Sequence, residues 1–261
     1  MSDFYLFGDY SEIYTKKRIE YEQYKKTPLY LNEIKYTNNL VSDFNETILA
    51  CMLYSTRDYD YFHNSLLMWG GLEIIDSAEC IRENIQNGYL NPAKREIRYM
   101  METIIKYVFV DQECKDLPLD KKIDYLNKEV PRSSISPINN IKGLKKEFID
   151  EVNQIYGTLC QYVHPSKTQI SEYLGREKRG SSFTFETHKE INPLNKLLFR
   201  SFDIFLTLVF IGIGMPTTGD LFIYVFDDKP EWKFHKGKFT QQISRMFDYK
   251  VERQNKNKHS S

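Results

Sequence analysis

The sequence has few of the features that mark a secreted, metal-binding or redox protein. Only four of its 261 residues are cysteines, and Cys51, Cys80, Cys114 and Cys160 form neither a CxxC pair nor a Cys/His ligand set. We therefore expect no disulfide framework, no metal site and no cofactor. The first residues include acids and lack the basic and apolar segments of a signal peptide. Together these absences predict a reduced, cytoplasmic protein.

An excess of charge and a long apolar run are absent too. The chain has 36 Lys and Arg against 36 Asp and Glu, which excludes a surface that is basic throughout, although a local basic patch remains compatible with this balance. The apolar run from Ile204 to Met215 is shorter than the roughly 20 residues of a membrane-spanning helix. We expect a buried helix there and no membrane association. P-loop, GxSxG, HExxH and GxGxxG motifs are missing, so NTPase, hydrolase, zincin and dinucleotide-binding functions lack support.

What the sequence does contain is helical periodicity. Apolar residues recur at three- and four-residue steps, which predicts an all-α fold: a helical bundle of five to six long helices. The cleanest pattern comprises Leu144, Phe148, Val152, Ile155, Leu159 and Tyr162, before His164-Pro165. A second stripe, between Tyr61 and Asn87, comprises Phe62, Leu66, Trp69, Leu72, Ile75, Ala78, Ile81 and Ile85, and Gly88 is expected to end that helix.

Other signals predict where elements begin and how the chain is divided. Asn-Pro pairs at Asn91 and Asn192 are typical of helix starts. The segments 182–187 and 221–226 have the patterns of short strands, which could pair as a small two-stranded β ribbon. We expect an N-terminal arm over residues 1–38, the helical bundle over 39–216, and a small extension with a helix and a polar tail over 217–261.

The first candidate catalytic residues are His164 and the Arg98–Glu102 pair. His164 follows the cleanest helical pattern and could act as an acid, a base or a phosphate partner; alternatively it is an ordinary C-terminal capping residue. Arg98 and Glu102 are one helical turn apart. They form either a simple ion pair or a pair in which Glu102 orients the Arg98 guanidinium toward a phosphate near His164.

The other candidate site residues are a second Arg/His pair, which could be catalytic, and a group of bases, which could bind nucleic acid. Arg57 and His63 would lie within reach of one anion at a helix N-terminus, unless their spacing is fortuitous and Asp58 and Asp60 are only N-caps. The segment after His164 is expected to be a basic loop, which either follows a nucleic-acid backbone or is merely solvated. Its bases are Lys167, Arg176, Lys178 and Arg179.

The Arg-Tyr-Met-Met-Glu run at residues 98–102 and the later run Tyr-Gly-Thr-Leu-Cys-Gln-Tyr-Val-His-Pro-Ser at 156–166 resemble bacterial abortive-infection-type proteins of the HEPN superfamily. The resemblance covers about residues 60–215. It implies a helical bundle, a homodimer, and a role in phage defence or a toxin–antitoxin system. Many such proteins are metal-independent ribonucleases that use an Arg, a polar residue and a His, a spacing that Arg57, Asp58 and His63 match.

Three functions follow as hypotheses, of which the third is an enzyme of another class. In the first, the protein is a HEPN-like ribonuclease in which His transfers protons and Arg stabilises the charged phosphorane, with RNA as its substrate. In the second, it is a non-catalytic helical module that binds a protein partner, such as an antitoxin, or senses an infection product. Convergence of an Arg and a His in one concave site would favour the nuclease.

Overall fold

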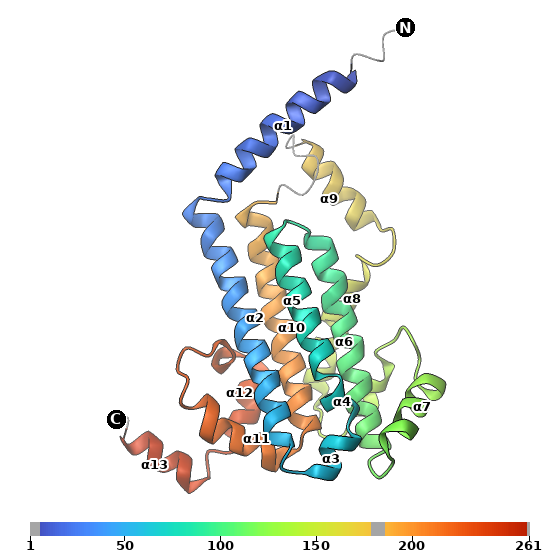
Figure 1. Ribbon diagram of the computed structural model, residues 1–261, viewed down its shortest axis with the longest axis vertical. Coiled ribbons are helices and arrows are strands. Elements are labelled where there is room, and N and C mark those ends of the chain that lie inside the picture. Colours follow the sequence, from blue (N-terminus) through green and yellow to red (C-terminus); the bar gives the residue numbers. More distant parts are fainter. Residues whose placement is uncertain (1–5, 179–185, 260–261) are drawn as a thin grey trace.

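The structure, a computed structural model, describes residues 6–178 and 186–259 (Figure 1). These ranges contain thirteen α-helices, a few short 3₁₀ or π-helical turns and no strand. The all-α prediction is confirmed. The count of five to six helices is not, because short helices lie between the long ones. Within the same ranges, no helix combines the length and the apolar character that crossing a bilayer requires.

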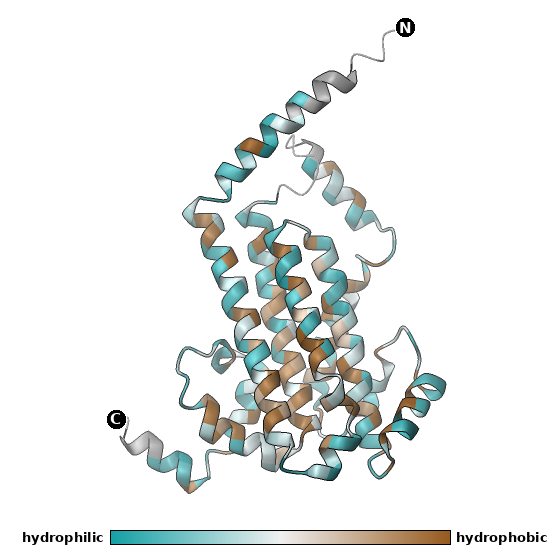
Figure 2. Ribbon diagram, viewed as in Figure 1, coloured by the Kyte–Doolittle hydropathy of each residue, from teal (hydrophilic) through white to brown (hydrophobic). Residues whose placement is uncertain are grey.

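Four long helices form a closed ring, in which each packs against two others, and a fifth packs against two of the four. The ring consists of α2 (Pro28–Ser55), α5 (Gly71–Gln86), α6 (Leu90–Glu113) and α10 (His188–Gly212), and the fifth helix is α8 (Lys146–Cys160). Each helix alternates hydrophobic and hydrophilic residues, as Figure 2 shows, and turns its apolar stripe inward. In the centre the rings of Phe44 and Phe202 stack with their centroids 4.1 Å apart. Apolar burial on this scale is the main stabilising contribution to the fold.

Shorter elements lie at the two ends of this bundle (Figure 1). The upper end has α1 (Leu6–Tyr24) and α9 (Lys167–Lys178). The lower part has α3 (Tyr59–Asn64), α4 (Leu66–Trp69), α7 (Leu119–Glu129), α11 (Met215–Leu221), α12 (Lys238–Arg245) and α13 (Val251–His259), with short turns at Ser136–Asn140, Phe222–Phe226 and Lys233–Lys236. The α8 stripe is buried as predicted, although α8 ends at Cys160, before His164.

The helix predicted between Tyr61 and Asn87 is divided into α3, α4 and α5. Asp58 accepts a hydrogen bond from the Tyr61 backbone N–H, and the Ser65 side chain accepts one from the Met68 N–H, so new helices begin at both places. A further break falls at Gly70, where an added Cβ would meet the Tyr107 ring. Gly88 ends α5 with a φ of 76°, as predicted.

Three further expectations from the sequence were wrong in their details. Leu221 ends α11 and Phe222–Phe226 is a π-helical turn, so this half of the expected β ribbon is helical; residues 182–185 of the other half lie outside the described residues. The helix α10 begins before Asn192, because Thr187 and Glu190 form a capping box, and Pro193 lies inside it. Similarly, Tyr89 rather than Asn91 is the N-cap of α6.

The predicted segment boundaries do not fall at breaks in the backbone. The helix α2 continues through residues 38 and 39, and α11 continues through residues 216 and 217. In α2 the burial of Tyr30 and Thr37 joins the first part of this helix to the same core as the rest.

Candidate functional site

The first candidate pair, Arg98 and Glu102, belongs to a polar seam between α6 and α8. Arg98 Nε lies 3.0 Å from Glu102 Oε1, and Arg98 Nη2 donates to the Tyr156 hydroxyl at 3.1 Å. The same hydroxyl donates to Glu102 Oε1 at 2.9 Å, and Lys106 Nζ lies 3.6 Å from the other carboxylate oxygen. We use the name polar seam for Arg98, Glu102, Lys106 and Tyr156. The seam confirms the i,i+4 ion pair.

The polar groups of the seam contact one another and are largely shielded from solvent. The charged side chains of Arg98 and Glu102 are largely buried. Burial and the neighbouring Glu102 carboxylate raise the pKa of Tyr156 to about 12, so its hydroxyl keeps its proton at neutral pH. The Arg98 guanidinium already faces a carboxylate and a hydroxyl, so binding a phosphate there would require these contacts to be broken.

A second group of contacts ties α9 to the first turns of α6. Lys94 Nζ lies 3.4 Å from Glu172 Oε1 and 3.7 Å from the centre of the Tyr162 ring. The Tyr162 hydroxyl donates to the same Glu172 oxygen at 2.8 Å, and Arg95 Nε donates to the Tyr162 carbonyl at 2.9 Å. Burial and Glu172 raise the pKa of Tyr162. These contacts fix the chain just before His164.

His164 itself is exposed, four residues beyond the end of α8. It therefore does not cap that helix. Two bases, Lys94 and Arg95, contact Tyr162, which is two residues away. Lys94 is itself paired with Glu172, and the Arg98 guanidinium contacts Glu102 and Tyr156, so Arg98 and His164 do not converge on one site.

The second candidate pair, Arg57 and His63, does not converge on one site. Arg57 Nη1 donates to Asp220 Oδ2 at 3.0 Å, and its guanidinium lies over the Tyr54 ring. The His63 ring is exposed, lies against the Tyr59 ring at a tilt of 30° and places Nδ1 2.9 Å from the Tyr59 carbonyl oxygen. Figure 1 places α3 at the end of the bundle opposite α9, so the two Arg/His pairs are far apart.

The expected basic loop after His164 is mostly a helix. Lys167–Lys178 forms α9, because Ser166 accepts a hydrogen bond from the Gln169 N–H at its start. The Arg176 guanidinium pairs with the buried carboxylate of Glu186, while Lys167 is exposed. Lys178 ends α9, but its side chain and all of Arg179 lie outside the described residues. A continuous basic track is therefore not seen in the part that is described.

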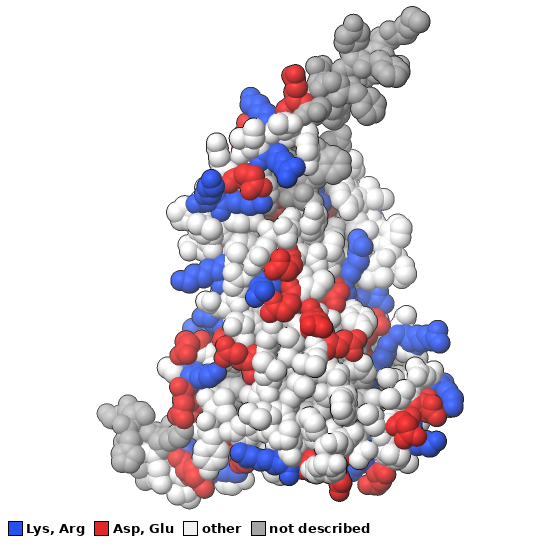
Figure 3. Space-filling model, viewed as in Figure 1, with Lys and Arg blue, Asp and Glu red and all other residues white. Residues whose placement is uncertain are grey.

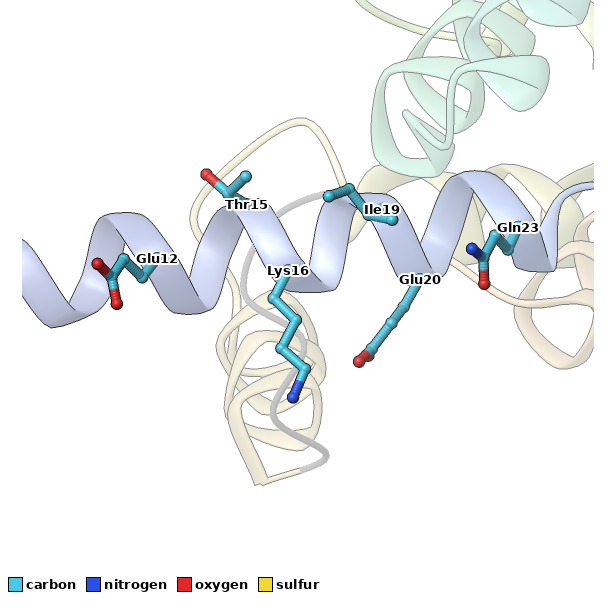
Figure 4. Close-up of a pocket in the computed structure, with 6 residues that line it drawn as sticks. All are labelled: Glu12, Thr15, Lys16, Ile19, Glu20 and Gln23. Carbon is cyan, nitrogen blue, oxygen red and sulfur yellow. The ribbon is translucent and has the colours of Figure 1, made fainter.

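Two pockets of the described residues are further candidate sites, and neither has a lining typical of a catalytic site. A hollow of about 510 Å³ is lined by one helix only, α1, and Figure 4 shows that Thr15 and Ile19 point away from Lys16 and Glu20. A larger cavity of about 920 Å³ at the lower end is lined by bases and acids together, including Lys115, Asp60 and Asp116. The described residues contain no cluster of His, Cys, Asp or Glu with the geometry of a metal site.

An apolar surface stands out on the face formed by α2, α4 and α5. Leu49 and Leu53 are 50% and 67% exposed, and Trp69 and Leu72 are 58% and 60% exposed. Met52, between the two leucines, fills the space beside Gly71, so α2 and α5 are in close contact between the two pairs. We call these four residues the apolar face. Figure 3 shows a broad uncharged area over this lower part of the bundle, below a group of acidic side chains.

Sequence reasoning missed both Tyr156 and this apolar face. Tyr156 lies four residues before Cys160 and beside the apolar stripe of α8, but nothing in the sequence pairs it with α6. Trp69 and Leu72 were expected to be buried in one long helix, and that was wrong because the chain turns at Ser65 and Gly70.

Comparison with known proteins adds no guide to function: no family model, no curated protein and no solved structure matches this chain.

Proposed function

We propose that this protein is a non-catalytic helical interaction module that binds a protein partner through the apolar face. The observation that carries the proposal is the exposure of Leu49, Leu53, Trp69 and Leu72 on adjoining helices. Large contiguous apolar patches on a folded domain are typical of interaction sites, and tryptophan is enriched among residues that dominate binding energy. The same residues contribute little to the stability of the isolated chain, so their exposure has no folding benefit.

The proposal is tested by site-specific crosslinking in the source cell. A photoreactive amino acid at position 53 or 72 should form discrete crosslinks to protein, because both side chains stand in the interface. The same amino acid at the exposed position Lys121, on α7, is the matched control and should form none. The additional substitution Leu49→Asp should abolish the products. An absence of products at both 53 and 72 would contradict the proposal.

A second candidate, the HEPN-like ribonuclease of a phage-defence or toxin–antitoxin system, is favoured by one observation. His164 is exposed and follows a segment held by the bases Lys94 and Arg95. An exposed His can transfer a proton to or from RNA, and a homodimer would supply two such groups. In this proposal the protein acts in the cytoplasm.

The nuclease is tested with RNA in the presence of EDTA. Cleavage should persist without metal and should be lost in His164→Ala. His63→Ala is the matched control, because that ring lies at the opposite end of the bundle and should leave cleavage unchanged. RNA that stays intact at high protein concentration excludes this candidate.

A further inference from the structure

The neutral net charge of the chain hides two oppositely charged segments. Between Leu40 and Ala93, which includes the whole apolar face, there are eight acidic and only two basic residues. Both bases are already paired, Arg57 with Asp220 and Arg82 with Glu79. Between Lys229 and Ser261 the balance is reversed, with nine basic and three acidic residues.

The acidic residues border the apolar face. Asp76 and Glu83 occupy exposed positions on α5 one and three turns beyond Leu72, whereas Glu46, on α2 before Leu49, is paired with Lys229 at 2.8 Å. Figure 3 shows the acidic group immediately above the uncharged area. Two copies that met face to face would bring these acids together, and like charges across an interface oppose binding. The partner surface should instead combine apolar side chains with bases.

The chain itself has such a surface at the junction of α12 and α13. Met246, Tyr249 and Val251 are each more than half exposed, and Lys250 belongs to the same segment; the side chains of Lys256 and Lys258 lie outside the described residues. Arg253 fixes this junction: it donates to Asp227 at 2.9 Å and contacts Ser244, and so holds α13 in its orientation. Figure 1 shows α13 projecting away from the bundle. We call residues 246–258 the basic segment.

We propose that the apolar face binds the basic segment of a second copy of this chain, so that two copies exchange these segments in a dimer. This inference rests on the proposed function and names its partner. Met246, Tyr249 and Val251 would cover Leu53, Trp69 and Leu72, and Lys250 would face Asp76. Such an arrangement covers the exposed apolar groups of both surfaces and places opposite charges at the rim.

Sedimentation of the purified full chain tests the dimer directly. The expected mass is twice the 31.1 kDa of one chain. Trp69→Ser on the face and Tyr249→Ser on the segment should each weaken association about tenfold or more, since both remove a central apolar side chain. Ile170→Ser, an equally exposed apolar residue on α9, is the control and should have no effect. A chain that stays monomeric at its highest soluble concentration, or a dimer that survives Tyr249→Ser, overturns the inference.

Charge reversal tests the pairing of the two surfaces. Asp76→Lys alone should weaken the dimer, and so should Lys250→Glu alone. Both substitutions in one chain should recover much of the association, because opposite charges face each other again. Failure of this recovery, with each variant folded by circular dichroism, contradicts the pairing.

Crosslinking from position 53 separates this inference from the proposed function. A product of two copies of the chain supports both. A product with a different protein only overturns the dimer while the interaction module stands. No product at all removes both.

Discussion

At the scale of single residues, Asp111 on α6 holds together three elements of the lower end. Its carboxylate accepts hydrogen bonds from the Ser65 hydroxyl at 2.6 Å and from the Leu66 and Leu67 N–H groups at 2.9 and 3.0 Å. Lys122 Nζ lies 3.1 Å from the same carboxylate, and both side chains are buried. One residue thus caps α4 and anchors α7.

We expect Asp111→Ala to lower the free energy of unfolding by about 3–5 kcal/mol, because it leaves the Lys122 ammonium buried and unpaired. Adding Lys122→Met should recover part of this loss, since the unpaired charge is then removed as well. Urea denaturation of the two single variants and the double variant measures the coupling. Purely additive effects would show that the two groups do not interact.

The Tyr156 hydroxyl offers a second test at this scale. Tyr156→Phe should lower the free energy of unfolding by about 1–3 kcal/mol, because it removes the bridge between Arg98 and Glu102. The control Tyr89→Phe, at an exposed ring, should change this free energy little.

The pKa of Tyr156 is raised from 10.0 to about 12 in the folded protein. The stabilisation is therefore fully present below pH 10 and declines as the pH rises toward 12, so the difference between the wild type and Tyr156→Phe should shrink over that range.

At the scale of elements, α12 is positioned by a carboxylate from α10. Asp203 is buried and accepts hydrogen bonds from the Phe239 and Thr240 N–H groups at 3.0 and 2.9 Å, which satisfies the start of α12. An added Cβ at Gly237 would meet this carboxylate. The helix can therefore dock closely only because residue 237 has no side chain.

Two matched glycine substitutions test this docking. Gly237→Ala should lower the free energy of unfolding by about 1–3 kcal/mol, because the Asp203 carboxylate must move. Gly157→Ala is the control: it lies on the exposed side of α8, near the end of this helix, with open space around its Cβ, and should raise the free energy of unfolding by about 0.5–1 kcal/mol. Equal effects of the two substitutions in thermal or urea unfolding would contradict this account.

At the scale of the whole molecule, α1 is joined to the bundle by its last turns. Tyr21 is buried and donates to the Glu186 carbonyl at 2.8 Å, and the Tyr24 hydroxyl accepts from the His188 N–H at 3.0 Å. The preceding described side chains of α1 are mostly exposed. A chain that begins at residue 21 should therefore have nearly the same free energy of unfolding as the full chain. For a chain that begins at residue 28, this free energy should be lower by about 1–3 kcal/mol, because the apolar burial of Tyr21 and Tyr24 is lost. Urea titration distinguishes these outcomes.

Much of the helical framework could be predicted from the sequence, but the candidate site could not. Phe148, Val152, Ile155 and Leu159 are buried on one side of α8, as their spacing indicated. The Arg98–Glu102 pair was also predictable, because residues four apart on a helix lie on one face. The tyrosine that bridges them comes from a helix 54 residues later, and no local rule connects the two.

The sequence by itself determined the all-α fold and the core-facing stripe of α8, because side-chain periodicity is a local property of the helix. Only the tertiary structure decided that Trp69 and Leu72 face outward, that the polar seam is closed by Tyr156, and that the two Arg/His pairs lie at opposite ends of the bundle. These outcomes depend on how separate helices pack. Packing is set by the fit of side chains far apart in the chain, and periodicity within one helix does not specify it.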